Sequence, residues 1–238
     1  MKVALITGAS GGIGSAIAET LANDGFTTIW HYSSHSDGMD EKAKQYHGLA
    51  VHADLSDISQ IQEMTEFVFA KLGHVDVLVN NAGISVSGLL TDIDSQTRRK
   101  LFDVNIIGAI ELTRLLLPPM IHQKHGCILN ISSMWGQVGA SCEVDYSATK
   151  SAMIGFTKAL AQEVAPSGIR VNCITAGVIR TKMLDCYDEM TLQALAEETP
   201  LQRLGTPLDI ANTASFLCSD KADFITGQVL GVNGGFVI

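Results

Sequence analysis

Short apolar runs alternate with segments of helical periodicity along nearly the whole chain. The runs are mostly continuous rather than alternating between apolar and polar positions, which is typical of strands covered on both faces. We expect strands at 3–7, 27–31, 49–53, 75–80, 127–131, 170–174 and 228–232. We expect helices at 12–23, 39–46, 58–72, 97–122, 145–164, 183–198 and 208–218.

This repeated strand–helix order predicts an α/β fold. The expected architecture is a doubly wound, parallel, seven-stranded sheet of Rossmann type with helices on both faces. No linker-like change of composition and no internal repeat divides the 238 residues, so we expect a single domain over 1–238.

The composition narrows the classes of partner. With 46% hydrophobic and 17% charged residues the chain can bury a large core, and its net charge of -9 argues against nucleic acid or an anionic membrane as the main partner. The apolar stretches 106–110 and 115–117 are too short to span a bilayer, and the apolar run that ends at Thr7 is too short for a signal peptide. We therefore expect a cytoplasmic protein.

The cysteines and histidines do not predict a metal site. The five cysteines are odd in number and lack C-x-x-C spacing, so we expect reduced thiols. His122 and His125 have a spacing that could hold a metal but lack a third ligand nearby, so we expect none.

A glycine-rich segment, Thr7-Gly8-Ala9-Ser10-Gly11-Gly12-Ile13-Gly14, joins the first strand to the first helix. Glycine permits positive φ and a close approach of the backbone to a pyrophosphate, and a helix N-terminus offers unpaired N–H groups to phosphate. This placement favours nucleotide binding over a merely tight turn. Asn80-Asn81-Ala82-Gly83 follows the fourth strand and is either a second part of such a site or a polar turn.

Tyr146 and Lys150 are four residues apart on a predicted helix, so both side chains point to one face. A neighbouring ammonium favours a phenolate, so we expect a lowered pKa for Tyr146 and a role in proton transfer. Ser133 ends the fifth strand and Asn105 interrupts an apolar helix. The alternatives are a strand-end turn for Ser133 and a satisfied core amide for Asn105.

In this order the motifs resemble the short-chain dehydrogenase/reductase family. The match includes the loop 7–14, Asp54-Leu55, the segment 80–83, Asn105, Ser133, Tyr146-x-x-x-Lys150, Arg170-Val171-Asn172 and Val232-Asn233-Gly234-Gly235. Within the family, the segments 200–205 and 225–230 look most like bacterial 3-oxoacyl-[acyl-carrier-protein] reductases.

The resemblance implies hydride transfer between NAD(P)H and a carbonyl. It makes Tyr146 the proton donor, Lys150 the group that lowers the Tyr146 pKa and holds the nicotinamide ribose, Ser133 the partner of the carbonyl oxygen, and Asn105 the holder of a water. The implied cofactor-binding residues are Gly8, Ser10, Gly11, Gly12, Ile13, Gly14, Tyr32, Ser33, Ser34, Asp54, Leu55, Asn81, Ala82, Gly83, Tyr146, Lys150, Gly177, Ile179 and Thr181.

The resemblance also bears on the choice between NADP(H) and NAD(H). NAD-preferring members carry an acid at the position of Tyr32, and here no carboxylate follows until Asp37. Ser33, Ser34 and His35 offer donors to a 2′-phosphate, so we expect NADP(H) to be preferred, with NAD(H) possible. Gly11 stands where many NADP-dependent relatives have Arg, which weakens that preference.

The expected substrate is a small-molecule or carrier-bound ketone, with a 3-oxoacyl thioester first and acyl-carrier protein as a partner. Of two basic positions expected near the site entrance for that partner, Lys124 is basic and Ser167 is not. Ala176 replaces a usual proline, which would leave the loop after it more mobile. The lid over 180–199 would decide which substrate fits.

The segment 135–144 instead resembles 5-aminopentanone reductases, which act on a protein-bound ketone of elongation factor P. Glu143 or Asp145 would then face a cationic amine, unless both acids only cap the next helix. A third class is a catalytically silent nucleotide-binding scaffold. The family likeness also implies a homotetramer packed through helices 97–122 and 145–164.

Overall fold

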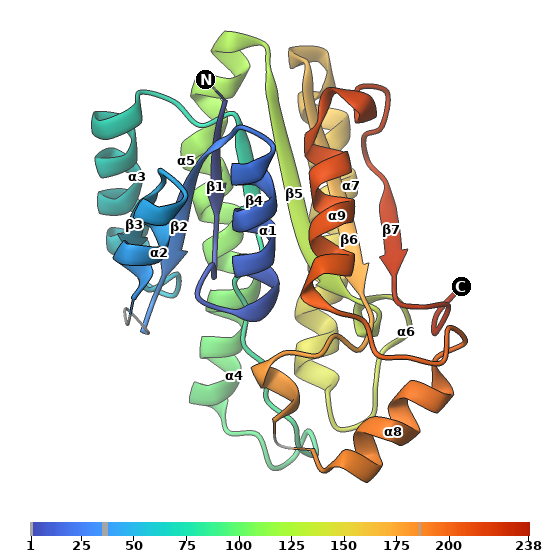
Figure 1. Ribbon diagram of the computed structural model, residues 1–238. Coiled ribbons are helices and arrows are strands. Elements are labelled where there is room, and N and C mark those ends of the chain that lie inside the picture. Colours follow the sequence, from blue (N-terminus) through green and yellow to red (C-terminus); the bar gives the residue numbers. More distant parts are fainter. Residues whose placement is uncertain (1, 35–37, 186) are drawn as a thin grey trace.

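The computed structural model describes residues 2–34, 38–185 and 187–238. His35 and Asp37, which entered the argument on cofactor choice, lie outside the described residues. The predicted fold is confirmed: seven strands form one all-parallel sheet in the order β3-β2-β1-β4-β5-β6-β7 (Figure 1). The strands are β1 (Val3–Ile6), β2 (Thr27–Tyr32), β3 (Leu49–His52), β4 (Val77–Asn80), β5 (Gly126–Ser133), β6 (Ile169–Ala176) and β7 (Val229–Val232).

The helices follow the predicted order, with two additions near the site. They are α1 (Gly12–Asn23), α2 (Met39–Gln45), α3 (Ile58–Leu72), α4 (Ser95–Phe102), α5 (Gly108–Gln123), α6 (Trp135–Val138), α7 (Val144–Val164), α8 (Glu189–Glu198) and α9 (Pro207–Cys218). The short α6 was not predicted. The predicted helix 183–198 is a 3-10 turn (Lys182–Leu184) followed by α8, because Asp188 caps a new helix start by accepting from the Thr191 N–H.

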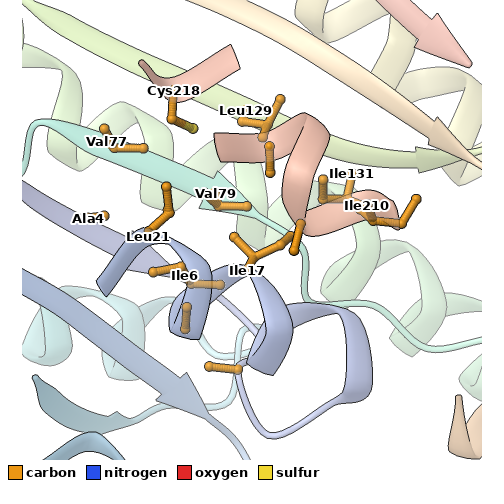
Figure 2. Close-up of a cluster of buried hydrophobic side chains, with 14 of the residues drawn as sticks. Ala4, Ile6, Ile17, Leu21, Val77, Val79, Leu129, Ile131, Ile210 and Cys218 are labelled. Carbon is orange, nitrogen blue, oxygen red and sulfur yellow. The ribbon is translucent and has the colours of Figure 1, made fainter. Parts of the chain in front are cut away.

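Two apolar cores sandwich the sheet. On one face, alternate strand residues such as Ala4 and Ile6 pack under α1, α2 and α9, and Figure 2 shows Ile17, Leu21 and Ile210 of α1 and α9 meeting them. The other face packs under α3, α5 and α7. Burial on both faces explains why the strands appear in the sequence as continuous apolar runs.

The two central strands β5 and β6 extend beyond their predicted ends. Their register runs without interruption to the pairs Ser132↔Thr175 and Ser133↔Ala176. Hydroxyl-bearing residues after the apolar run suggested a turn, but the backbone ladder continues because a neighbouring strand of equal length pairs with it. The ladder therefore carries Ser133 to the carboxyl edge of the sheet.

The predicted helix 97–122 is one continuous helical segment, Ser95–Gln123, but it is not regular. A π-helical turn, Asp103–Ile107, separates α4 from α5. By length and composition it is the one helix among the described residues that could cross a membrane, yet half of its apolar window is buried within the fold. That burial against α3 and the sheet is the environment of a core helix.

Candidate active site

The candidate site lies where the strand order reverses. β1 and β4 are neighbours, with β2 and β3 on one side and β5, β6 and β7 on the other. In open α/β sheets, ligands bind at the carboxyl ends of strands at such a point. The glycine-rich loop follows β1 there, and Asn81 follows β4.

The glycine-rich loop has the geometry of an anion cradle. Gly8 has φ +66°, a conformation that favours glycine, and a Cβ on Gly14 would overlap the Gly8 carbonyl oxygen. Gly11 caps α1 without a side-chain hydrogen bond, and no acidic residue lies in the first turn. The first N–H groups of α1 and its positive dipole end are therefore left to an anionic ligand.

Thr7 ties the glycine-rich loop to the residues that follow β4. Its hydroxyl accepts from the N–H groups of Asn81 at 2.9 Å and Ala82 at 3.0 Å. The Asn81 amide donates back to the Thr7 carbonyl at 2.8 Å and to that of Gly8 at 3.3 Å. The segment 80–83 is thus a built part of the loop's support and not only a polar turn.

The predicted Ser–Tyr–Lys group is assembled in the structure. Tyr146 and Lys150 share one face of α7, with the Lys150 Nζ 5.7 Å from the Tyr146 ring centroid. Ser133, at the end of β5, hydrogen-bonds the Tyr146 phenol. The Lys150 ammonium is buried and donates to the Ile131 carbonyl at 3.0 Å.

Asn105 is joined to the same site through the loop after β4. Its side chain lies in the π-helical turn, fully buried, and accepts from the Ile84 N–H at 2.8 Å while donating to the Ile84 carbonyl at 2.9 Å and to Thr149 at 3.2 Å. A Cβ on Gly83 would lie 3.3 Å from both the Asn105 Oδ1 and the Lys150 Nζ. Gly83 thus keeps the space between these two groups open.

The protein's own groups do not make Tyr146 acidic, contrary to the expectation from its spacing to Lys150. Burial raises the pKa of Tyr146 to about 12, the Ser133 hydrogen bond lowers it, and the Glu143 carboxylate raises it. Burial also lowers the pKa of Lys150 to about 8. The spacing argument failed because it counted the charge of the ammonium and left out the loss of solvent around both groups.

Comparison with known proteins agrees with this geometry. The family described as "Enoyl-(Acyl carrier protein) reductase" matches residues 8–237. The chain is 42% identical to an uncharacterized oxidoreductase, YmfI, of Bacillus subtilis, over 99% of this chain and 98% of that protein. It is 39% identical to the 3-oxoacyl-[acyl-carrier-protein] reductase FabG of Staphylococcus epidermidis over 98% of both chains, and 38% identical to the FabG of Thermotoga maritima over 100% of this chain and 98% of that one.

The chain belongs to the short-chain dehydrogenase/reductase family. It is therefore an NAD(P)-dependent oxidoreductase that acts on CH–OH or C=O groups. The cradle around Gly8 and Gly14, with the uncapped start of α1, fits the pyrophosphate of such a dinucleotide.

The residues expected near the adenosine in this short-chain dehydrogenase/reductase lie at the ends of β2 and β3. Tyr32 packs edge-on against His52, and the Ser33 carbonyl lies 2.8 Å from the His52 Nε2. The Asp54 carboxylate accepts from the Ser56 N–H at 2.9 Å and hydroxyl at 2.7 Å, so it already has donors. Of the others, Ser34 is exposed at the end of β2 and Leu55 is buried.

The remaining predicted residues approach the glycine-rich loop from the other side. A Cβ on Gly12 would lie 3.0 Å from the Thr181 Cγ2, so the loop after β6 touches the start of α1. Within that loop, Ile179 forms an isolated parallel bridge with Gly205. Gly177 packs so closely on the Asn233 backbone that a Cβ would lie 2.6 Å from its Cα. Ser10, Gly11 and Ile13 are exposed or half-buried in the loop.

The two acids before and in α7 differ in their partners. Asp145 is neutralised by Arg98 of α4, with Nε 2.9 Å from the carboxylate. Glu143 makes no side-chain capping hydrogen bond to α7; it accepts from the hydroxyls of Ser85 at 3.3 Å and Ser87 at 3.0 Å. Among the described residues, no cation forms an ion pair with Glu143.

The two positions expected near the site entrance for an acidic carrier protein do not lie there in this chain. Lys124 ends α5 just before β5, and a Cβ on Gly168, next to Ser167, would lie 2.5 Å from the Lys124 carbonyl oxygen. Both positions precede parallel strands, so they belong to the amino edge of the sheet, opposite Ser133 (Figure 1). The expectation was wrong because linear alignment carries no information on which edge a residue occupies within one chain.

Two contributors to the site escaped the sequence analysis. Thr7 was part of the glycine-rich motif but was not assigned a role, although a hydroxyl at the end of a strand is a frequent tie between loops. His31 is fully surrounded yet sits in an apolar strand, and its ring contacts the Gly8 amide. A buried imidazole in an apolar strand was the available signal.

Proposed function

We propose that this protein is an NADPH-dependent reductase that converts a ketone to the hydroxy product by hydride transfer, with Tyr146 as the proton donor. The observation that carries this proposal is the Ser133–Tyr146 hydrogen bond at the carboxyl end of β5, with the Lys150 ammonium on the same helix face. Gly83 links this group to the dinucleotide loop, because it lies beside Lys150 and follows Ala82, which Thr7 holds.

In this mechanism the bound nicotinamide supplies the hydride. The Tyr146 phenol, whose pKa burial raises to about 12, stays protonated at neutral pH and holds the proton that the new alkoxide needs. The Ser133 hydroxyl aligns that phenol and meets the carbonyl oxygen where negative charge develops. Lys150 offers a buried positive charge and donors to ribose hydroxyls.

Asn105 has a narrower role than the family resemblance implied. Its amide is committed to the Ile84 backbone and to Thr149, so it fixes the loop that carries Gly83. We propose that it keeps the Lys150 side of the site in place, and any bound water would share an amide that already has three partners.

The preference for NADPH over NADH is supported by the lack of a free carboxylate at the end of β2. Tyr32 occupies the position of the acid, and Asp54 on the neighbouring strand already accepts from Ser56. A 2′-phosphate therefore meets no direct charge repulsion there. Titration of both cofactors by their fluorescence tests this, with tighter binding of NADH as the contrary result.

The first candidate substrate is a 3-oxoacyl thioester. It is supported by the curated relatives that are named 3-oxoacyl-[acyl-carrier-protein] reductases, at 38–39% identity over nearly the whole chain. The test is NADPH oxidation with an acetoacetyl thioester. An enoyl thioester serves as comparison, because the matching family carries an enoyl reductase description. Turnover of the enoyl thioester alone would move the reaction from C=O to C=C.

A second candidate is a ketone that carries a cationic amine, such as a modified lysine side chain on elongation factor P. The observation that favours it is Glu143, whose carboxylate has no cationic partner among the described residues and is close enough to raise the pKa of Tyr146. Asp145, two residues on, is neutralised by Arg98, so only Glu143 remains to meet an ammonium.

The two candidates respond differently to Glu143→Gln. This change keeps the hydrogen bonds to Ser85 and Ser87 within reach of the side chain and removes its charge. With an amine-bearing ketone, loss of one charge pair should lower kcat/KM by about tenfold or more. With an acetoacetyl thioester, kcat/KM should change by less than about threefold. Equal effects on both substrates would remove Glu143 as a discriminating group.

We propose a homotetramer on the family likeness, and light scattering that reports a 25.4 kDa particle would reject it. A silent nucleotide-binding scaffold remains the contrasting class. Tight NADPH binding with no oxidation by any of the three ketone or enoyl substrates would favour the scaffold over the reductase.

A further inference from the structure

His31 is buried at 1% exposure in β2 and makes two hydrogen bonds with its ring. The Gly8 N–H donates to Nδ1 at 3.1 Å, and Nε2 lies 3.0 Å from the Ala53 carbonyl oxygen. A backbone N–H can only donate and a carbonyl can only accept, so Nδ1 carries no proton and Nε2 carries one. The two contacts therefore fix a single neutral tautomer.

The surroundings of His31 keep this tautomer neutral. Burial lowers the pKa of His31 to about 4, with a smaller opposing effect from the hydrogen bond to Ala53. The charged groups that act on the ring are His52, which lowers its pKa, and Asp54, which raises it. At neutral pH the Nδ1 lone pair is thus always available to the Gly8 amide.

His31 connects the two halves of the proposed dinucleotide site. Its backbone carbonyl accepts from the Ala9 N–H at 2.8 Å, and its ring holds the Gly8 N–H, so two successive amides of the loop depend on one residue. On its other side, the ring bonds Ala53, which immediately precedes Asp54. One side chain therefore sets the loop after β1 relative to the end of β3.

We propose that His31 is a positioning residue for the dinucleotide, acting through the Gly8 amide to hold the phosphate loop in its binding conformation. The inference rests on the proposed binding of NADPH at the loop 7–14. Gly8 is at φ +66° and its carbonyl is covered by Gly14, so a rotated Gly8 peptide would disturb the start of α1. Without an acceptor at Nδ1, binding energy would be spent on ordering that peptide.

A pair of amide substitutions separates the two contacts of the ring. In His31→Asn, the side-chain oxygen takes the place of Nδ1 and can accept from the Gly8 N–H, whereas the contact to Ala53 is lost. In His31→Gln, the longer amide reaches the Ala53 carbonyl in place of Nε2, and the Gly8 N–H loses its acceptor. Both variants remove the imidazole, so they share every effect of losing the ring itself.

The experiment measures the Kd of NADPH by fluorescence and the kinetic constants of ketone reduction. We expect His31→Asn to bind NADPH within about threefold of the wild type and His31→Gln to bind it about tenfold more weakly, as expected for one unsatisfied amide. The kcat at saturating NADPH should stay unchanged in both. Equal Kd values for the two variants, or a loss in kcat instead of in affinity, would overturn the inference.

Two controls keep the outcome interpretable. His74→Gln removes a histidine at the opposite, amino edge of the sheet, where it pairs with Asp76, and should leave the Kd unchanged. Gly14→Ala should abolish NADPH binding if the loop is the site. If wild type binds no dinucleotide, or Gly14→Ala still binds it, the proposed function fails and the inference fails with it. If only the asparagine and glutamine variants agree, the inference alone fails.

A measurement on the wild-type protein needs no variant that must fold. Nitrogen NMR of the imidazole should show the tautomer with hydrogen on Nε2 and an unprotonated Nδ1 at neutral pH. A ring protonated on Nδ1 would show that Gly8 is not its donor and would also overturn the inference.

Discussion

Replacing Asn105 by alanine should both destabilise the fold and slow ketone reduction. The side chain is completely buried and makes three hydrogen bonds, two of them to the backbone of Ile84 and one to Thr149. Alanine would leave the Ile84 N–H and carbonyl without partners. Ile84 is only partly buried, so water can satisfy part of this loss.

The expected size follows from these contacts. Two unpaired backbone groups at about 1 kcal/mol each, together with the lost contact to Thr149, give about 2–4 kcal/mol of lost unfolding free energy. In a chain of this length 1 kcal/mol shifts Tm by roughly 2–4 °C, so the melting temperature should fall by about 5–10 °C. A loosened loop at Gly83 would also misplace Lys150, and kcat should fall by about tenfold or more.

The assay is scanning calorimetry combined with steady-state kinetics well below the lowered Tm. Asn130→Ala is the matched control, because Asn130 is also fully buried and its side chain hydrogen-bonds Asn80 and Thr157. It should lose comparable stability but retain kcat. The reasoning is refuted if Asn105→Ala melts like the wild type, or if both variants lose kcat to the same extent.

Three further changes test the chemistry of the site. Tyr146→Phe should still bind NADPH but lose nearly all reduction, and turnover near wild type would remove its role as proton donor. Gly14→Ala should abolish NADPH binding in a fluorescence titration, because its Cβ would overlap the Gly8 carbonyl and lie 2.5 Å from the Asn81 amide. Burial lowers the pKa of Lys150 from 10.5 to about 8, so the unfolded chain holds more protons in that range and unfolding free energy falls as pH drops through it. Lys150→Met should be inactive yet more stable at pH 7 by about 1–3 kcal/mol, and denaturant titrations at pH 8 and 10 should show that it lacks this part of the pH dependence.

Much of the fold was accessible from the sequence because its signals are local. Continuous apolar runs mark the parallel strands, and the glycine spacing after β1 requires a tight turn into α1. Tyr146 and Lys150 share a helix face through spacing alone, and the structure confirms their approach. Local pattern was enough in these cases because each feature depends on a few successive residues.

Other features depend on contacts between distant segments and left no local signal. The Arg98–Asp145 ion pair, which neutralises one of the two acids near α7, joins residues 47 positions apart. The raised pKa of Tyr146 results from burial by the assembled fold. The π-helical turn lies where α5 begins against the end of β3: a Cβ on Gly108 would overlap the Leu55 carbonyl. None of these can be derived from spacing along the chain.

The turn Asp103–Ile107 has a consequence for how this helix tolerates changes of length. The Gly108 N–H donates to the Asp103 carbonyl, five residues back, so the helix accommodates one residue more than regular winding would place there. Deleting one residue from an ordinary core helix turns everything beyond it by about 100° and exposes its apolar face. A single deletion within 103–107 would instead restore regular winding and leave both flanking halves facing the sheet. Shortening here should therefore give a folded chain, with damage confined to the carboxamide that braces Ile84.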